Sequence, residues 1–343
     1  MTTTLPLTRD QLLEPVHRLP RERFAHLPTP LEEAPRLREA LGPDAPRIFI
    51  KREDQTGLAF GGNKVRHLEF RLADIRQRGA TAMTIMNPAV SNHARLHAAL
   101  AAKFGLSAHI LKIPSDQDAI VNGNLLLARM LGAEVIEPSS ADPDVLHAEY
   151  RALKERLEGE GHVVYDTAED PYSTIAGAFG FLIGAVEMLE QFERLQIKPD
   201  RIFLVYGASA AGLVLAGKLL GEKYRVHAVN IGDHHDPYDY VLDFAMRTSE
   251  LLGYGIEITR DDFDASAEYG SPGYAVPGDA TIEAISLAAR TEALIVDPVY
   301  TGKSLAALIG EIRKGKIGPD ENVVFIHTGG TPNPFSYSEH LLP

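Results

Sequence analysis

The sequence of 343 residues contains no cysteine. This absence excludes disulfide bonds, thiolate nucleophiles and thiolate metal sites. It also fits a reducing compartment, so we expect a cytoplasmic protein. The N-terminus has no basic segment followed by a long apolar run and therefore predicts no signal peptide. The most apolar stretch, residues 176–186, is interrupted by glycines, and it predicts a buried helix too short to span a bilayer.

An excess of positive charge is missing as well. The chain has 34 basic and 47 acidic side chains, which gives a formal net charge of −13. A protein with this balance has no general attraction for nucleic acid or for an anionic membrane surface, so we expect neither partner. Any anionic ligand must instead be held by local groups.

Short apolar runs and longer alanine- and leucine-rich stretches alternate after residue 47. The runs predict buried strands at residues 48–50, 82–86, 108–111, 163–165, 202–205, 226–230, 294–296 and 323–327. The stretches predict helices at residues 64–78, 92–104, 119–131, 173–195, 210–220 and 281–290. This alternation is typical of an α/β protein, here with two open parallel-sheet lobes of three α/β/α layers. The first 30 residues lack periodicity and predict an extended surface arm.

Ligands of such folds bind beyond the carboxyl ends of the strands, so the loops at these ends are the places to search. The first unusual loop is Gly61-Gly62-Asn63-Lys64. Adjacent glycines permit a close approach to a ligand, and the positive end of the following helix disfavours a charged lysine. A neutral amine can attach covalently to a carbonyl group. Taken alone, however, this loop is better explained as a glycine turn followed by a solvated lysine.

The second loop is Val90-Ser91-Asn92-His93. Ser91 and Asn92 are good helix N-caps, and the same position offers a hydroxyl, an amide and free backbone N–H groups to a substrate carboxylate. His93 and His97 share a helix face, but no carboxylate motif accompanies them, so we expect no metal site.

The third loop consists of small residues that join a strand to a helix: Gly207, Ala208, Ser209, Ala210, Ala211 and Gly212. Such loops are typical of phosphate cradles. Leu213 and Val214 stand where a Walker A loop needs Lys and Ser/Thr, and Ser209 replaces the middle glycine of a dinucleotide fingerprint. The loop therefore fits a lone phosphate group, although close packing of helix and strand explains it equally well.

Taken together, these loops resemble those of the fold-type II pyridoxal-phosphate enzymes, the tryptophan synthase β-like superfamily. The most similar branch is the one that contains 1-aminocyclopropane-1-carboxylate (ACC) deaminase and D-cysteine desulfhydrase. The resemblance is collinear from about Leu27 to the C-terminus. It is carried by residues 27–31 (LPTPL), 51–54 (KRED), 61–69 (GGNKVRHLE), 91–95 (SNHAR), 272–274 (PGY), 297–303 (DPVYTGK) and 327–332 (HTGGTP).

The resemblance implies a pyridoxal 5′-phosphate cofactor, a small amino-acid substrate and a homodimer. It implies that Lys64 carries the cofactor and moves the Cα proton, while Ser91 is a carboxylate ligand or base. It also implies a large cofactor-binding domain of residues 1–64 and 175–343, with a small domain of residues 65–174 inserted in it. The resemblance further implies that Asn92 contacts the ring oxygen of the cofactor, that Thr301 contacts its pyridine nitrogen and that Thr328 makes another cofactor contact. The loop Gly207–Gly212 would bind the phosphate. The residues implied to line the substrate side are Val90, His93, Tyr274 and Tyr300.

Two segments depart from the family pattern. Asn87-Pro88-Ala89-Val90 replaces a glycine-rich approach that ends in glutamine, and Ser209-Ala210 stands where Thr-Gln is usual. ACC deaminase-like enzymes carry glutamate at the position of Thr301, and a threonine cannot hold a proton on the pyridine nitrogen as a carboxylate does. We therefore expect a D-cysteine desulfhydrase-like β-elimination that gives a 2-oxo acid and ammonia. The alternatives are ACC ring opening, dehydration, racemisation or β-replacement, or a catalytically silent cofactor-binding protein.

Overall fold

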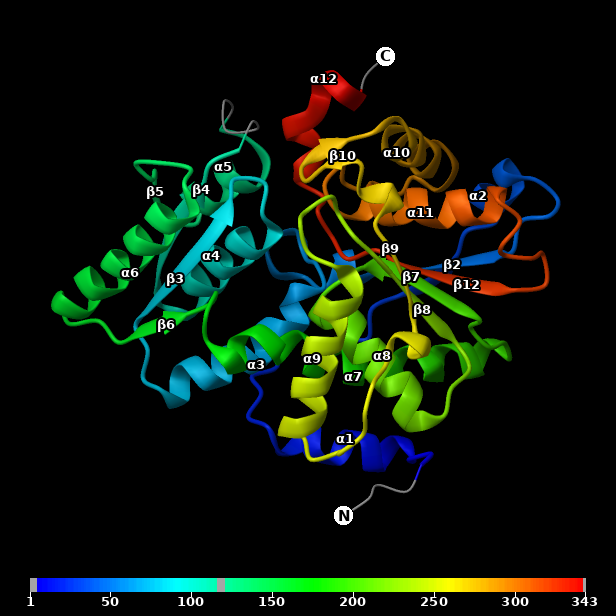
Figure 1. Cartoon of the computed structure of the whole chain (residues 1–343), viewed down its shortest axis with the longest axis horizontal. Coiled ribbons are helices and arrows are strands. Elements are labelled where there is room, and N and C mark those ends of the chain that lie inside the picture. Colours follow the sequence, from blue (N-terminus) through cyan, green and yellow to red (C-terminus); the bar gives the residue numbers. More distant parts are fainter. Residues whose placement is uncertain (1–4, 116–120, 342–343) are drawn as a thin grey trace.

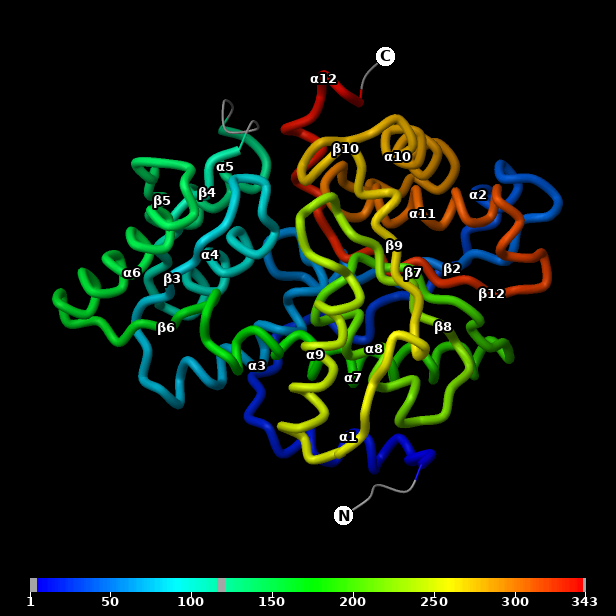
Figure 2. The backbone as a smooth tube through the Cα atoms, in the orientation of Figure 1, coloured from blue at the N-terminus to red at the C-terminus, as the bar shows by residue number. Residues whose placement is uncertain are grey.

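The chain folds into two lobes that lie side by side, each built on its own parallel sheet (Figures 1 and 2). The computed structural model describes residues 5–115 and 121–341. Helices cover both faces of each sheet, so the predicted α/β class with two three-layer lobes is confirmed.

The larger sheet has six strands in the order β1-β2-β12-β7-β8-β9, of which only the edge strand β1 runs antiparallel to its neighbour. The smaller sheet has the order β5-β4-β3-β6, and all its pairs are parallel. A two-stranded hairpin, β10-β11, is separate from both. The strands are β1 (Leu31–Glu33), β2 (Arg47–Lys51), β3 (Ala82–Pro88), β4 (Ser107–Ile113), β5 (Glu134–Ile136), β6 (Val164–Asp166), β7 (Arg201–Val205), β8 (Arg225–Val229), β9 (Asp264–Ser266), β10 (Pro272–Gly273), β11 (Val276–Pro277) and β12 (Asn322–Ile326).

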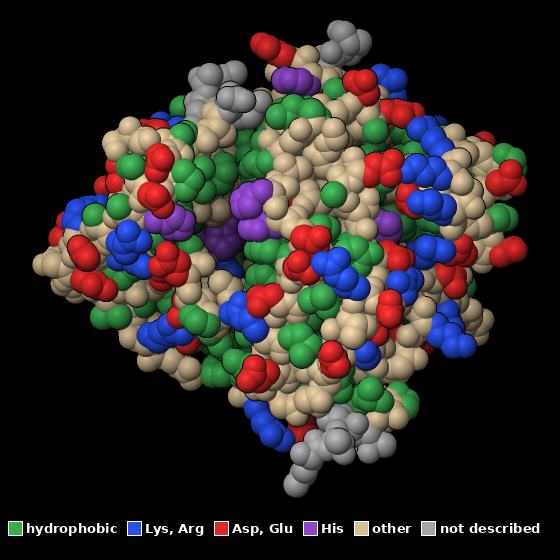
Figure 3. Space-filling view, viewed as in Figure 1, with side chains coloured by type: hydrophobic (Ala, Val, Ile, Leu, Met, Phe, Trp, Pro, Cys, Tyr) green, Lys and Arg blue, Asp and Glu red, His purple; other side chains and the backbone are tan. Residues whose placement is uncertain are grey.

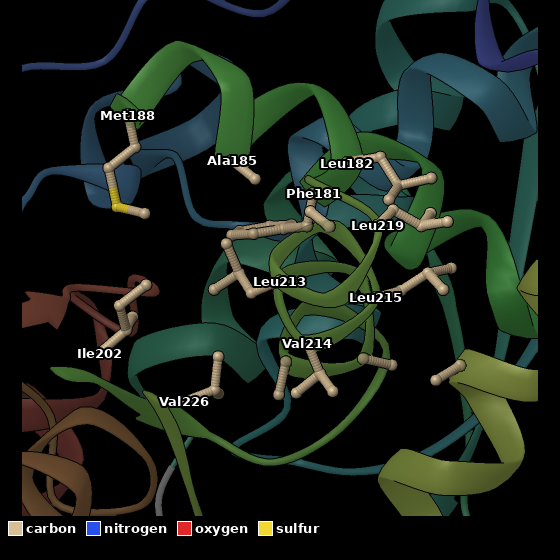
Figure 4. Close-up of a cluster of buried hydrophobic side chains, with 14 of the residues drawn as sticks. Phe181, Leu182, Ala185, Met188, Ile202, Leu213, Val214, Leu215, Leu219 and Val226 are labelled. Atoms are coloured by element: carbon tan, nitrogen blue, oxygen red, sulfur yellow. The ribbon is translucent and has the colours of Figure 1, made fainter. Parts of the chain in front are cut away.

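The larger sheet is covered on one face by α1, α7, α8 and α9 and on the other by α2, α10 and α11 (Figure 1). Figure 4 shows the first of these cores, in which Phe181 and Leu182 of α7 gather with Leu213 and Leu219 of α8. These helices are α1 (Arg9–Arg18), α2 (Pro35–Leu41), α7 (Pro171–Leu195), α8 (Ala208–Leu220), α9 (Pro237–Leu251), α10 (Asp279–Glu292) and α11 (Thr301–Arg313).

The smaller sheet packs against α3 and α4 through one core and against α6 through another. Its helices are α3 (Lys64–Gln77), α4 (Asn92–Phe104), α5 (Gly123–Met130) and α6 (Pro143–Gly159). A short helix, α12 (Ser338–Leu341), ends the described chain, and the 3-10 turns are η1 (Glu53–Gln55), η2 (Leu58–Phe60), η3 (Arg260–Asp262), η4 (Glu268–Gly270) and η5 (Asn333–Tyr337).

Two predictions about local structure were wrong. The N-terminal segment is not an extended arm, because α1 begins at a capping box between Thr8 and Gln11 and buries Leu12 and Val16 in the core. Residues 294–296 form no strand, because Leu294 and Val296 pack in the core beside α10 and α11 while Ile295 is 47% exposed and its carbonyl oxygen lies 3.0 Å from His327 Nε2. The predicted helix at residues 119–131 is observed as Gly123–Met130, and its residues 119 and 120 lie outside the described residues.

Helix α7 is longer than the apolar stretch within it. It has 25 residues, and by length and composition alone it could cross a membrane. However, 78% of its most apolar window is buried inside the protein, where it packs against α3, α8 and α9. The apolar stretch at residues 176–186 was expected to be too short to span a bilayer, but it is the burial of α7, and not its length, that identifies it as a core helix.

Candidate active site

Lys64 begins α3 and is separated by Asn63 alone from two glycines whose backbone is tightly held. Gly62 has a φ of +131°, and a Cβ atom on it would lie 3.2 Å from the carbonyl oxygen of Thr328. The hydroxyl of Thr56 lies 2.9 Å from both the backbone N and the O of Gly62, and the next residue, Asn63, donates its N–H to the Thr328 carbonyl at 3.0 Å. Glycine is therefore required here, because the loop must touch the backbone that follows β12.

The amine of Lys64 points toward the larger lobe, where its Nζ lies 5.9 Å from the ring centre of Tyr300. The pKa of Lys64 is lowered to about 8, chiefly by burial and also by the nearby guanidinium groups of Arg71 and Arg95, against the opposing charge of Asp297. Both arginines are themselves buried. The surroundings of Lys64 thus favour the uncharged amine that covalent attachment of a cofactor requires.

The loop from Gly207 to Gly212 starts α8 and fits a phosphate group. Gly207 has a φ of +126°, and nothing lies within 4 Å of where its Cβ would be. No side chain caps the helix, so the N–H groups of its first turn have no partner within the helix. Ser209 lies 2.8 Å from Asn63 Nδ2 and 3.0 Å from His67 Nε2, and these contacts hold the cradle beside Lys64.

Sequence reasoning missed the roles of Asn63 and His67. They are four residues apart and therefore lie on the same side of the helix start, on the face that Lys64 presents to the larger lobe. This spacing was the available signal. The pKa of His67 lies well below its ordinary value because the ring is buried among the cations of Arg71 and Lys64, so it is neutral near pH 7.

The segment after β3 brings Ser91 and Asn92 into the same region. Ser91 caps α4 by accepting hydrogen bonds from the backbone N–H groups of His93 and Ala94 at 3.2 and 3.3 Å. Asn92 Oδ1 accepts from Arg95 at 3.4 Å and from Asn124 at 2.9 Å. The ring of His93 stacks on His97 with their centres 3.9 Å apart. All these groups lie on the smaller lobe.

Tyr274 and Tyr300 belong to the larger lobe and form the wall of the site that faces the smaller lobe. Their hydroxyl oxygens are 2.6 Å apart, and their rings meet edge to face. Burial raises the pKa of Tyr274 to about 12 and raises that of Tyr300 well above its ordinary value. Both hydroxyls therefore remain protonated throughout the neutral range.

Thr301 lies beside Tyr300 but its hydroxyl is already engaged. It donates to Asp297 Oδ1 at 2.6 Å and accepts the backbone N–H of Asp297 at 2.7 Å, and the whole residue is buried. The hydroxyl of Thr328, in contrast, has no hydrogen-bond partner among residues 5–115 and 121–341. Of these two threonines, Thr328 is thus the one with a hydroxyl left for a ligand.

Val90 does not line an open pocket. It is 4% exposed and packs with Ala275, Val299 and Tyr337 in a small apolar cluster against which Tyr274 and Tyr300 lie. This cluster joins the two lobes, because Val90 follows β3 whereas its partners belong to the larger lobe.

The predicted site residues therefore converge between the lobes. Figure 3 shows a hollow there, with histidine side chains at its rim and floor. Over the described residues, no group of three or more His, Cys, Asp or Glu side chains is arranged to hold a metal ion.

Comparison with known proteins identifies the family. The profile described as "Pyridoxal-phosphate dependent enzyme" matches residues 23–329. The chain belongs to this family. It is 34% identical to a D-cysteine desulfhydrase of Salmonella typhimurium over 340 residues, covering 95% of this chain and 100% of the relative. It is also 33% identical to a probable ACC deaminase of Cryptococcus neoformans over 332 residues, covering 94% of this chain and 96% of the relative.

The solved structures agree with this assignment. The crystal structure of an ACC deaminase homologue matches with a TM-score of 0.85 and 29% identity, over 96% of this chain and 98% of the other. A pyridoxal-phosphate-dependent aspartate racemase has the same fold, with a TM-score of 0.63 at 15% identity. The family, the cofactor and the expected class of pyridoxal-phosphate-dependent lyase are thereby confirmed.

Proposed function

We propose that this enzyme catalyses a D-cysteine desulfhydrase-like β-elimination on a small amino acid, giving a 2-oxo acid and ammonia. The observation on which this proposal rests is the set of hydrogen bonds that the carboxylate of Asp297 accepts. Its Oδ1 accepts hydrogen bonds from the N–H and hydroxyl of Thr301, and its Oδ2 accepts from the N–H groups of Val299 and Tyr300 and from Asn333. This carboxylate is committed to the protein and has no capacity left to hold a proton on the cofactor ring.

That arrangement favours elimination over reactions that accumulate negative charge on the ring. Pyridoxal phosphate withdraws electrons from the Cα atom of the amino acid bound to it. With a threonine at position 301 and a saturated Asp297, the ring nitrogen lacks a carboxylate partner, so this withdrawal is weak. Departure of a β-substituent relieves the charge directly, and the similar proteins include a D-cysteine desulfhydrase.

The residues that would hold the cofactor are Lys64, the loop from Gly207 to Gly212, Asn92 and Thr328. Lys64, with its pKa lowered to about 8, supplies an amine that can take the Cα proton near neutral pH. Ser91 already accepts the backbone N–H groups of His93 and Ala94, so the N-terminus of α4 offers the backbone N–H of Asn92 to the substrate carboxylate. The protonated pair of Tyr274 and Tyr300 stands where a leaving group on the facing side can receive a proton.

The test is the release of pyruvate and ammonia from a panel of D- and L-amino acids with sulfur, sulfonate, chloride or hydroxyl at Cβ, together with ACC. Release from D-cysteine or its analogues supports the proposal. Release only from ACC, only from hydroxy amino acids, or racemisation without release would replace it. Turnover of nothing on the panel, with the cofactor's visible absorption present, would indicate a silent cofactor-binding protein. In parallel, Lys64→Ala should abolish both the visible absorption and turnover while the protein remains folded.

Three further features belong to the same proposal. A homodimer is what the resemblance to the family implies, and a cytoplasmic location fits the absence of cysteine. The domain division at residues 64/65 and 174/175 is supported by the strands, because every strand of the smaller sheet lies between residues 82 and 166. Sedimentation equilibrium of the purified protein and limited proteolysis near residue 175 test the dimer and the division.

A further inference from the structure

One buried asparagine of the smaller lobe links three groups. Asn124 is the second residue of α5 and is 1% exposed. Its Nδ2 atom lies 2.8 Å from the carbonyl oxygen of Val90, 2.9 Å from Asn92 Oδ1 and 2.9 Å from Asn333 Oδ1. Val90 and Asn92 belong to the smaller lobe, whereas Asn333 belongs to the segment after β12. The side chain of Asn124 therefore ties the lobes together directly behind Asn92.

The contacts continue into the larger lobe. Asn333 is fully buried, and its Nδ2 donates to Asp297 Oδ2 at 3.1 Å. The same oxygen of Asp297 accepts the backbone N–H of Tyr300 at 3.2 Å. A chain of side chains thus runs from Asn92 through Asn124, Asn333 and Asp297 to Tyr300.

The direction of every amide in this chain follows from its charged end. Both oxygens of Asp297 act as acceptors of N–H and O–H groups, so Asp297 takes the nitrogen of Asn333 and turns the oxygen of Asn333 toward Asn124. That oxygen in turn requires the nitrogen of Asn124, whose two N–H protons are shared among the oxygens of Asn333, Asn92 and Val90, while its own Oδ1 has no partner among the described residues. Two contacts outside the chain demand the same directions, because the Val90 carbonyl only accepts and the Arg95 guanidinium beside Asn92 only donates.

The consequence is that the nitrogen of Asn92 is turned away from Asn124 and Arg95. We propose that Asn124 is a positioning residue that fixes the Asn92 amide with its N–H donors toward the cofactor's ring oxygen, and that it takes this orientation from Asp297 through Asn333. The inference rests on the proposed role of Asn92 at the cofactor. It adds that this relay of hydrogen bonds between the two lobes determines the orientation of the Asn92 amide. Asn92 therefore directs its N–H donors toward the cofactor only when both lobes are packed together.

Asn122 provides a matched control. Its Nδ2 donates to the carbonyl oxygen of Phe335 at 2.8 Å, so it makes an inter-lobe hydrogen bond two residues from Asn124 without touching Asn92. Asn122→Ala removes this exposed contact between the lobes and the cap that Asn122 places on the N–H of Gly123, but none of the hydrogen bonds of the Asn124 side chain. A loss of cofactor affinity or thermal stability that both variants share is due to weaker packing of the lobes. A loss that only Asn124→Ala shows is due to the orientation of Asn92.

The experiment compares Asn92→Ala, Asn124→Ala, the double variant and Asn122→Ala. Each cofactor-free protein is titrated with pyridoxal phosphate by absorption, and its thermal unfolding is recorded. We expect Asn92→Ala and Asn124→Ala each to weaken cofactor binding roughly tenfold and to shift the visible absorption, as loss of one oriented hydrogen bond predicts. The double variant should be no weaker than Asn92→Ala, because Asn124 acts through Asn92.

The outcomes separate the inference from its premise. If Asn92→Ala changes neither affinity nor spectrum, the proposed contact of Asn92 is wrong and the relay has no target. If Asn92→Ala has the expected effect but Asn124→Ala matches Asn122→Ala, the relay is wrong and the role of Asn92 stands. Asn124→Asp covers the case in which the alanine variant does not fold. Its carboxylate would demand the nitrogen of Asn92 and turn the Asn92 oxygen to the cofactor, so an unchanged spectrum for Asn124→Asp would also overturn the relay.

Discussion

The hydroxyl oxygens of Tyr274 and Tyr300 lie 2.6 Å apart on the wall that faces Lys64. Each tyrosine is held by a different buried ion. Asp297 accepts the backbone N–H of Tyr300, and the ammonium group of Lys303 donates to the carbonyl oxygen of Gly273, directly before Tyr274. The backbone beside each tyrosine is thus held by a different buried side chain, neither of which contacts the hydroxyls.

Tyr274→Phe should slow turnover about a hundredfold while cofactor binding is unchanged, because it removes one protonated hydroxyl from the facing wall. Since the pKa of Tyr274 is raised to about 12, the wild-type rate should show no tyrosine titration below pH 10. Steady-state kinetics over pH 6–10 check both statements. If Tyr274→Phe retained the full kcat, the hydroxyl of Tyr274 would have no role in the reaction.

Lys303→Met should destabilise the protein by about 3 kcal/mol or more, because breaking a buried charged contact leaves its partners unsatisfied. Lys303 is fully buried and also donates to the carbonyl oxygens of Ile231 at 2.8 Å and Gly270 at 2.9 Å. Urea unfolding measures the loss. Lys316→Met is the control, since Lys316 pairs with Glu311 at the surface and should contribute less than about 1 kcal/mol. Equal losses for the two variants would contradict the structural role of Lys303.

The rate at which pyridoxal phosphate attaches to the cofactor-free protein should rise with pH and level off above pH 8. The pKa of Lys64 is lowered to about 8 by burial and by Arg71 and Arg95, so half of the reactive uncharged amine is present at that pH. About one amine in ten is then uncharged at pH 7, against fewer than about one in a thousand for an ordinary lysine. Stopped-flow absorption gives the midpoint. A midpoint near that of free lysine would show that the site does not lower the pKa.

Val90→Gln should lower the free energy of unfolding by about 1–3 kcal/mol, since an amide without a partner would enter an apolar cluster. Val90→Thr, which adds a hydroxyl at almost constant volume, should lower the free energy of unfolding by a smaller amount. If the cluster shapes the substrate wall through Tyr274 and Tyr300, Val90→Gln should also alter KM and the order of preference on the amino-acid panel while the cofactor spectrum is retained. An unchanged stability would show that the cluster accommodates a polar group.

Much of the architecture could be predicted from sequence because its signals are local. The period of apolar residues and the small residues after strands predicted both parallel sheets and the three loops around Lys64, Ser91 and Gly207. Where a local signal was weak or misleading, the prediction failed. The helix Arg9–Arg18 begins at a capping box that was overlooked, and residues 294–296 have the composition of a strand although they are held in the core by the packing of Leu294 and Val296 alone.

The sequence by itself determined the chemistry that was available: a lysine after two glycines, small residues for a phosphate, and no thiol. Only the tertiary structure decided how these groups are oriented. Asn124 and Asn333 are 209 residues apart, yet their contact sets the direction of the Asn92 amide, and Asp297 is committed to its neighbours although its side chain alone could have served the cofactor. Hydrogen-bond direction depends on which donors and acceptors the packed lobes bring together, and residue spacing along the chain does not contain that information.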